Sequence, residues 1–347
     1  MKKLFRLIIL LSFLVLSISF AQAEWAAQYP ASSMIFPYVN TLSGFQTFIL
    51  ISNQDTSPDW GASHGSPSVV VKFNPKCGRG NTQSASLTTK QTVVITPPPA
   101  FEGWAEAFVK GDISDESADA NFPVSGMSVI LDISNGVAYS VKSVQWLGDL
   151  SVGESGDPDV YGCNSSGACS PAWWGGNINE PIVASLWRNS NYGRTMFVLC
   201  DPSGRHINEL SSNNTTINYL PNMAQLDIYS KSESDTHMSV EWCTGADAGK
   251  PGIVTIGVGT TEGPLGVTDT SVSNPIATMT DAPYGFAQAF NLRQFTWIDI
   301  NGDGNGDSNE DFNTSHLLGA VFTRISNTYF PKAVEAHPMI LKWTTMY

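Results

Sequence analysis

Short runs of apolar and β-branched residues recur along the whole chain, and several of them alternate between apolar and polar positions. The segment 238–242 alternates in this way and places Trp242 on its apolar side. A period of two puts one face of a strand on a core and the other in water, so these runs predict half-buried strands. Gly, Pro, Asn and Asp separate the runs. Strands are predicted at 47–52, 68–73, 92–96, 127–133, 137–142, 196–200, 238–243 and 253–258.

Helical spacing of apolar residues is rare in this chain. One segment near the C-terminus has it and predicts a short helix containing Leu318, Val321, Phe322 and Ile325. Many short strands with turn residues between them favour sandwiches or barrels. We therefore expect an all-β fold.

The strand pattern lapses at 148–180, where Gly, Ser, Asp, Asn and Pro dominate. We interpret this segment as a connection between two tandem Ig-like β-sandwich units, at 24–147 and 181–347. One larger β domain is the alternative. Trp173 and Trp174 lie in the connection, and adjacent rings cannot easily face one core. We expect them to pack between the units, with stacking on sugar rings as the alternative.

Two pairs of similar segments indicate an internal duplication. Residues 99–108 read PAFEGWAEAF and are echoed by PYGFAQAF at 283–290, while TFILI at 47–51 is echoed by TMFVL at 195–199. The two offsets differ, so the second copy must contain an insertion of about 34 residues.

Composition narrows the class of protein. Of 347 residues, 42% are hydrophobic and only 14% are charged, which excludes disorder and a coiled coil. The net charge of −13 argues against a nucleic-acid partner, because binding phosphates requires basic patches.

The N-terminus predicts export. Basic residues in the first six positions precede an apolar run at 7–20 and the small-residue pattern Ala21-Gln22-Ala23. These are the parts of a secretory signal peptide, which we place at 1–23. The apolar run is shorter than the roughly 20 residues that cross a bilayer, so no integral membrane span is expected after cleavage. We expect a bacterial protein that is secreted, periplasmic or on the cell surface.

An oxidising compartment favours disulfides between the five cysteines. Cys163 and Cys169 flank a short turn, and Cys200 and Cys243 each end a predicted strand. We expect these two pairs to form and Cys77 to remain unpaired, although spacing alone leaves other connectivities open.

The most specific motif is an acidic loop at 299–310, DINGDGNGDSNE, which fits the D-x-[DN]-x-[DN]-G-x5-E pattern. Ca²⁺ requires six to eight oxygen ligands, and this spacing supplies them around a bend that Gly304 permits. The expected calcium ligands are Asp299, Asn301, Asp303, Asn305, Asp307 and Glu310.

The loop resembles an EF-hand calcium loop, and its Asn-Gly-Asp-Gly core is similar to one half of a bacterial dockerin repeat. Only one such segment occurs, so the resemblance does not imply cohesin binding. The residues entering the loop, 295–298, read as strand and not as helix. The same letters also fit the calcium loops of β-hairpins, which suit an all-β chain.

Catalytic patterns are weak. The G-x-S-x-G match at 61–65 lies between two predicted strands and lacks the helix that a nucleophile elbow requires. The acidic segment 112–119 is expected to be a solvated turn, and His237 and Glu241 a surface pair on one strand face. The sequence therefore favours a protein that is not an enzyme.

Our leading hypothesis is a calcium- and disulfide-stabilised β protein with an adhesive, structural or assembly role, whose partner is a glycan or another cell-surface protein. The alternatives are a carbohydrate-binding module or glycoside hydrolase, and a filament or surface-layer subunit. Two facing carboxylates in a cleft would favour the hydrolase. An unpaired N-terminal strand would favour polymerisation by strand exchange.

Overall fold

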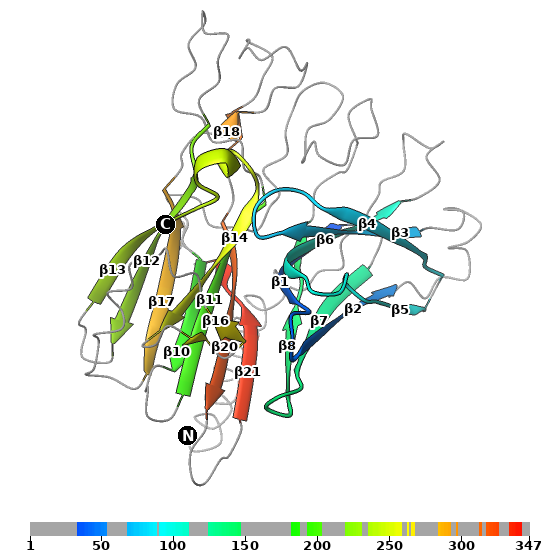
Figure 1. Cartoon of the computed structure of the whole chain (residues 1–347), viewed down its shortest axis with the longest axis horizontal. Helices are drawn as coiled ribbons and strands as arrows, with labels where there is room; N and C mark the ends of the chain where they lie inside the picture. Colours follow the sequence, from blue (N-terminus) through cyan, green and yellow to red (C-terminus); the bar gives the residue numbers. More distant parts are fainter. Residues whose placement is uncertain are drawn as a thin grey trace, which may run out of the picture.

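The computed structural model is built almost entirely of β-strands (Figure 1). Within the residues that it describes, the only helical turn is the 3-10 turn η1 (Gly245–Asp247), and no helix is long and apolar enough to cross a membrane. The described residues are 33–53, 68–88, 90–110, 124–146, 182–187, 193–202, 219–230, 235–258, 262–263, 265–267, 284–292, 296–297, 312–313, 317–325 and 333–341.

The N-terminal unit comprises β1 to β9 in two antiparallel sheets. Sheet I has the order β4 (Asn81–Ser86), β3 (Ser68–Pro75), β6 (Glu102–Lys110), β1 (Ser33–Asn40) and β9 (Val144–Trp146). Sheet II has the order β5 (Thr92–Ile95), β2 (Phe45–Asn53), β7 (Val124–Asp132) and β8 (Val137–Lys142). The first described strand, β1, is paired on both sides, with β6 and with β9.

The C-terminal unit comprises β10 to β22. Sheet III has the order β14 (Gly252–Val258), β11 (Gly193–Asp201), β20 (Leu318–Ile325) and β21 (Ala333–Pro338). Sheet IV has the order β13 (Asp235–Trp242), β12 (Asn222–Ser230), β17 (Tyr284–Asn291), β10 (Ile182–Trp187) and β22 (Ile340–Leu341). Two short hairpins pair β15 (Glu262–Gly263) with β16 (Gly266–Val267) and β18 (Thr296–Trp297) with β19 (Phe312–Asn313).

The two units have the same topology. Replacing β1 to β9 in turn by β10, β11, β12, β13, β14, β17, β20, β21 and β22 converts sheet I into sheet IV and sheet II into sheet III. The echoed segments fall on corresponding strands, β6 with β17 and β2 with β11. The hairpins β15–β16 and β18–β19 have no counterpart in the described part of the first unit. The topology therefore agrees with a duplication that carries an insertion in its second copy.

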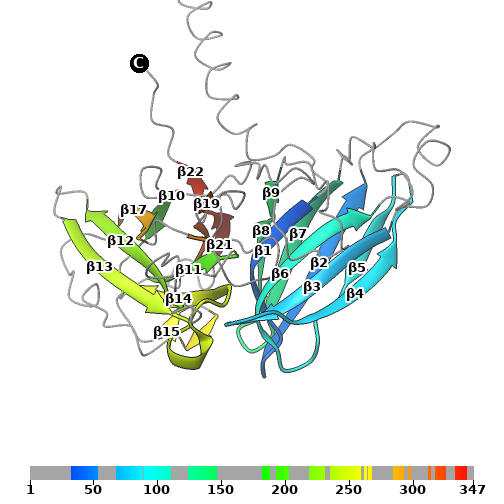
Figure 2. The ribbon, with the colours of Figure 1, turned by 90° about the horizontal axis from the view of Figure 1, so that it is seen from above.

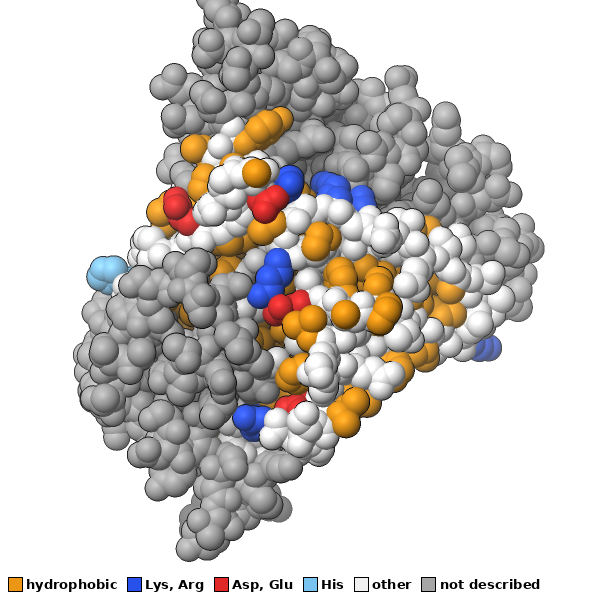
Figure 3. Space-filling model, in the orientation of Figure 1, with side chains coloured by type: hydrophobic (Ala, Val, Ile, Leu, Met, Phe, Trp, Pro, Cys, Tyr) orange, Lys and Arg blue, Asp and Glu red, His pale blue; other side chains and the backbone are white. Residues whose placement is uncertain are grey.

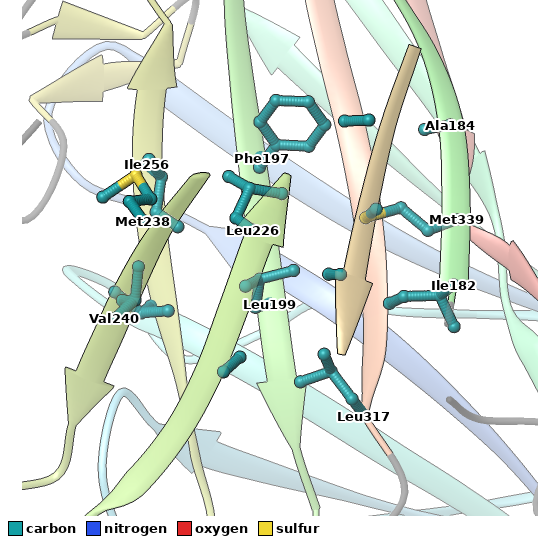
Figure 4. Close-up of a cluster of buried hydrophobic side chains, with 14 of the residues drawn as sticks. Ile182, Ala184, Phe197, Leu199, Leu226, Met238, Val240, Ile256, Leu317 and Met339 are labelled. Atoms are coloured by element: carbon teal, nitrogen blue, oxygen red, sulfur yellow. The ribbon is translucent and has the colours of Figure 1, made fainter. Parts of the chain in front are cut away.

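Each unit has its own core between its two sheets. Met34 of sheet I and Ile49 and Ile51 of sheet II belong to the core of the first unit. In the second unit, Leu226 and Val240 of sheet IV point toward Leu199 of sheet III (Figure 4). Trp242 is buried in this core, as its alternating strand predicts.

A third apolar core lies between the units. The outward residues of sheet III, such as Met196 and Phe322, pack against Trp104 of sheet I and Tyr139 of sheet II. Strand β21 contacts β8, and the views in Figures 1 and 2 both place the two units side by side. Sheet III is therefore covered on both faces.

All eight predicted strands are confirmed, but the predicted C-terminal helix is wrong. Residues 318–325 form strand β20, whose first six residues are all buried. Because both faces of β20 contact a core, its apolar residues follow no period of two, and their spacing imitates that of a helix.

Candidate functional site

The junction between the units is closed by a disulfide. Cys77, which follows β3, is bonded to Cys243, which follows β13, with 5.4 Å between their Cα atoms and 166 residues between them in sequence. The predicted Cys200–Cys243 pair is therefore wrong. Cys200 lies on the outward face of β11 in the core between the units, whereas Cys243 belongs to the core inside the C-terminal unit. Sheet III separates the two side chains.

Backbone pairing holds the two cysteine segments together. The amide of Gly78 donates to the carbonyl of Pro251 at 2.7 Å, and that of Ile253 donates to the carbonyl of Lys76 at 2.8 Å. A Cβ added to Gly252 would collide with the Lys76 carbonyl oxygen and with Cys243 Sγ. Glycine at this position is therefore what allows the segments to approach closely enough to bond.

Cys200 is a buried free thiol. Burial raises its pKa well above the ordinary value, and the neighbouring carboxylates of Asp201 and Glu106 raise the pKa further. Since the thiolate is the nucleophile, this cysteine is held in its unreactive form.

A charged cluster on the outward face of sheet I centres on Glu106. Its Oε1 lies 3.9 Å from Lys72 Nζ and 3.7 Å from Arg79 Nη1, and it accepts a hydrogen bond from Asn74 Nδ2 at 3.2 Å. The side chains of Lys72 and Glu106 are only 8% and 7% exposed. A buried carboxylate with cationic partners fixes geometry, because breaking such a pair leaves an uncompensated charge.

Two further polar contacts, each made by a side chain, cross between the units. Arg324 Nη1 of β20 lies 3.4 Å from Asp132 Oδ2 of β7, and Asp132 is 1% exposed. Asn135 donates to both oxygens of the same carboxylate through its backbone and its side chain. Asn40 Nδ2 donates to the carbonyl of Leu265 at 3.3 Å. These contacts fix the relative position of the units where the apolar core ends.

Two polar atoms in the core between the units have no hydrogen-bond partner in the described structure, namely Trp104 Nε1 and Tyr139 Oη. Burial raises the pKa of Tyr139 well above its ordinary value, with a smaller lowering by Arg324 and a smaller raising by Asp132. The junction therefore contains orphaned polar atoms, whose burial costs stability.

The outward face of sheet IV carries a second polar cluster. Gln288 Nε2 donates to Asp227 Oδ2 at 3.2 Å and to Tyr229 Oη at 2.8 Å, and Gln225 Nε2 donates to Asp227 Oδ1 at 2.8 Å. Beside it, the rings of Tyr229 and Phe286 are stacked with centroids 4.6 Å apart. Phe286 is 45% exposed. This cluster is the counterpart of the Glu106 cluster, since Gln288 and Glu106 hold the same position in the echoed segments.

The expected calcium ligands, from Asp299 to Glu310, lie outside the described residues. Their flanks are described: Thr296 pairs with Asn313 and Trp297 with Phe312 in an antiparallel hairpin. The described residues that flank the loop are therefore strands and not helices.

Other sequence predictions also fall outside the described residues: the signal peptide at 1–23, the Cys163–Cys169 pair, the Trp173-Trp174 step, and the segments 61–65 and 112–119. His237 and Glu241 are described and are both exposed on β13, as predicted. The bond made by Cys77 was not predicted from the sequence. Cys77 is the single cysteine of the first unit, and this could have indicated a partner in the second unit.

Comparison with known proteins identifies no family for this chain. The sequence matches no model of a known protein family, and no curated protein is significantly similar to it.

Proposed function

We propose that this chain is an exported bacterial β protein that acts as a rigid structural or adhesive element at the cell surface. The observation that carries the proposal is the junction, where one disulfide and one apolar core join two sandwich units. Interfaces between domains that move are usually small and more polar, whereas this one is a core in its own right. The junction suits a protein that holds a shape.

The disulfide also supports export. Disulfides persist in oxidising compartments and are rare in the cytosol. The basic and apolar N-terminus, with Ala21-Gln22-Ala23 after it, supplies a route to such a compartment.

Calcium is part of the proposal. The loop from Asp299 to Glu310 would bind Ca²⁺ across the ends of the β18–β19 hairpin and stabilise the C-terminal unit. Extracellular sites of this chemistry have dissociation constants of about 10⁻⁴ to 10⁻³ M, so about 1 mM Ca²⁺ adds about 0.4 to 1.4 kcal/mol. Asp299→Ala or Glu310→Ala should abolish the rise in Tm on adding calcium. Ser308→Ala, at a loop position that supplies no ligand, should retain that rise.

Cell fractionation tests export. We expect the full chain, expressed in a bacterial host, to be recovered outside the cytosol, to begin at residue 24 and to remain with washed cell envelopes. Non-reducing peptide mapping should find Cys77 joined to Cys243. As a control, Leu10→Arg with Leu11→Arg interrupts the apolar run and should leave the chain uncleaved and reduced in the cytosol. An unaltered chain that stays uncleaved and reduced inside the cell would overturn the proposal.

A further inference from the structure

The outward face of sheet II is apolar, and its residues belong to none of the three cores formed by the described residues. Alternate residues of its strands point away from the core of the unit, and the apolar ones are half-buried or exposed. Val94 is 59% exposed. The apolar residues of this face are Phe48, Leu50, Val94, Met127, Val129 and Leu131.

This face has no carboxylate in its described part, although the chain contains 31 Asp and Glu residues. Its charged member is Lys142 of β8, which is exposed. In Figure 3 hydrophobic side chains gather among uncharged ones over the described part of the N-terminal unit, with basic side chains at its edges and acidic side chains nearer the junction. An apolar face of this extent that lacks a carboxylate marks an interaction surface.

The duplication indicates what covers such a face. In the C-terminal unit the corresponding face belongs to sheet III, and it is the face that packs against the N-terminal unit. Phe48 and Leu50 occupy the positions of Met196 and Val198 in the echoed segments. Val129 pairs with Phe48 as Phe322 pairs with Met196, so it corresponds to Phe322. The exposed face is thus the equivalent of one that already binds a unit of this fold.

The complementary surface is also duplicated. Sheet III packs against the outward face of sheet I, where Trp104 is fully buried. The corresponding face of sheet IV carries Phe286 in place of Trp104 and Gln288 in place of Glu106, and Phe286 is 45% exposed. Asp227 corresponds to Lys72, because Asp227 pairs with Gln288 as Lys72 pairs with Glu106. Within the described residues, each molecule therefore presents a second copy of both surfaces that meet at its own junction, with Phe286 exposed on sheet IV and Asp227 and Gln288 only 8% and 6% exposed.

We propose that copies of this protein associate head to tail, with the outward face of sheet II of one molecule packed on the outward face of sheet IV of the next. The contact repeats between molecules the packing that joins the two units within one. The interface is heterologous and does not use the same patch twice, so it generates a ring or an open chain of molecules and not an isologous dimer.

The size of the face suits this partner. The sheet has four strands about 4.8 Å apart, and its longest strands have nine residues at about 3.3 Å per residue. The face therefore measures roughly 19 by 30 Å. This area is of the same order as the roughly 800 Å² that each partner buries in a standard interface. In the sequence the position that corresponds to Cys77, five residues after Asp227, is Ser232, so the contact between molecules is non-covalent. The proposal rests on the structural role within the proposed function.

Complementation between two variants tests the proposal. Val94→Glu alters the sheet II face and Phe286→Glu the sheet IV face, and both positions are exposed, so both variants should fold with an unchanged far-ultraviolet spectrum. We expect the weight-average mass of the oxidised mature protein, measured by sedimentation, to rise with concentration past that of a dimer. Each variant alone should remain monomeric, with association weakened at least about tenfold, or about 1.4 kcal/mol. An equimolar mixture should form a one-to-one dimer, because each variant retains the face that the other lacks.

Ser84→Glu adds the same charge to an exposed strand position outside both faces and should assemble normally. Three results would overturn the proposal: a monomer at every concentration, a closed dimer lost only in Val94→Glu, or equal loss in Ser84→Glu. A monomer that is exported and oxidised would overturn head-to-tail assembly and leave the proposed function standing.

Discussion

Buried polar residues at the junction fall into two kinds. Asp132 receives hydrogen bonds from Asn135 and an ion pair from Arg324, so its carboxylate is satisfied although it is almost inaccessible. Tyr139 lies in the same core with its hydroxyl unpaired. Removing a satisfied group leaves its partners orphaned, whereas removing an orphaned group relieves a cost. The two residues should therefore respond oppositely to substitution.

Tyr139→Phe should leave the free energy of unfolding unchanged or raise it by up to about 1 kcal/mol, whereas Asp132→Ala should lower it by about 2–4 kcal/mol. Because burial raises the pKa of Tyr139 in the folded state, the hydroxyl ionises first in the unfolded state. The free energy of unfolding is therefore unaffected by this group below the ordinary tyrosine pKa of 10.0 and falls as the pH rises above that value. Urea unfolding at neutral pH and near pH 11 measures both effects. A phenylalanine variant that loses as much stability as the parent between these pH values would contradict the account.

The elements at the junction depend on close backbone approach. The segment after β3 pairs with the start of β14 through an isolated bridge between Cys77 and Gly252. This bridge places Cys77 beside Cys243, and it requires a residue without a side chain at 252. The element that positions the disulfide is therefore a backbone contact between the two units.

Gly252→Ala should lower the free energy of unfolding by about 1–3 kcal/mol, because the added methyl group meets a carbonyl oxygen and a sulfur with no room to relax. It should also leave a measurable fraction of Cys77 reduced, as detected by thiol labelling after denaturation. Gly136→Ala is the matched control, since a Cβ there meets nothing within 4 Å and the cost, about 1–2 kcal/mol, is that of its positive φ alone. Complete oxidation of Gly252→Ala with no larger loss than the control would show that the close approach is unimportant.

The whole molecule is two copies of one fold joined by three kinds of interaction: a core, ion pairs and hydrogen bonds, and a disulfide. The disulfide closes a loop of 166 residues, which in the chain-entropy model corresponds to about 5 kcal/mol. The core between the units does not depend on it. The units should thus stay associated without the covalent bond, at lower stability.

Replacing both Cys77 and Cys243 by serine should lower the free energy of unfolding by about 2–5 kcal/mol and leave one cooperative transition, because the shared core still couples the units. Equilibrium unfolding in urea measures both quantities. Cys200→Ala is the control: it keeps the disulfide and should retain its sensitivity to reductant. Two separate transitions in the serine variant would mean that the disulfide alone couples the units.

The sequence by itself determined the all-β class and the positions of strands with one buried face. Strands β2, β5, β8 and β13 alternate between core and solvent, and a local period of two is visible without knowledge of the fold. The echo between β6 and β17 was also readable, because duplication leaves a trace in the chain itself.

Tertiary structure alone decided the rest. Strand β20 has a core on each face, so its apolar run has no period and imitates a helix. Strand β1 lies between β6 and β9, which only the completed sheet reveals. The partner of Cys243 was decided by the packing of one unit on the other, since Cys200 is nearer in sequence but lies across sheet III. Local patterns record the immediate environment of a strand, whereas cysteine pairing and contacts between units depend on residues brought together over more than a hundred positions.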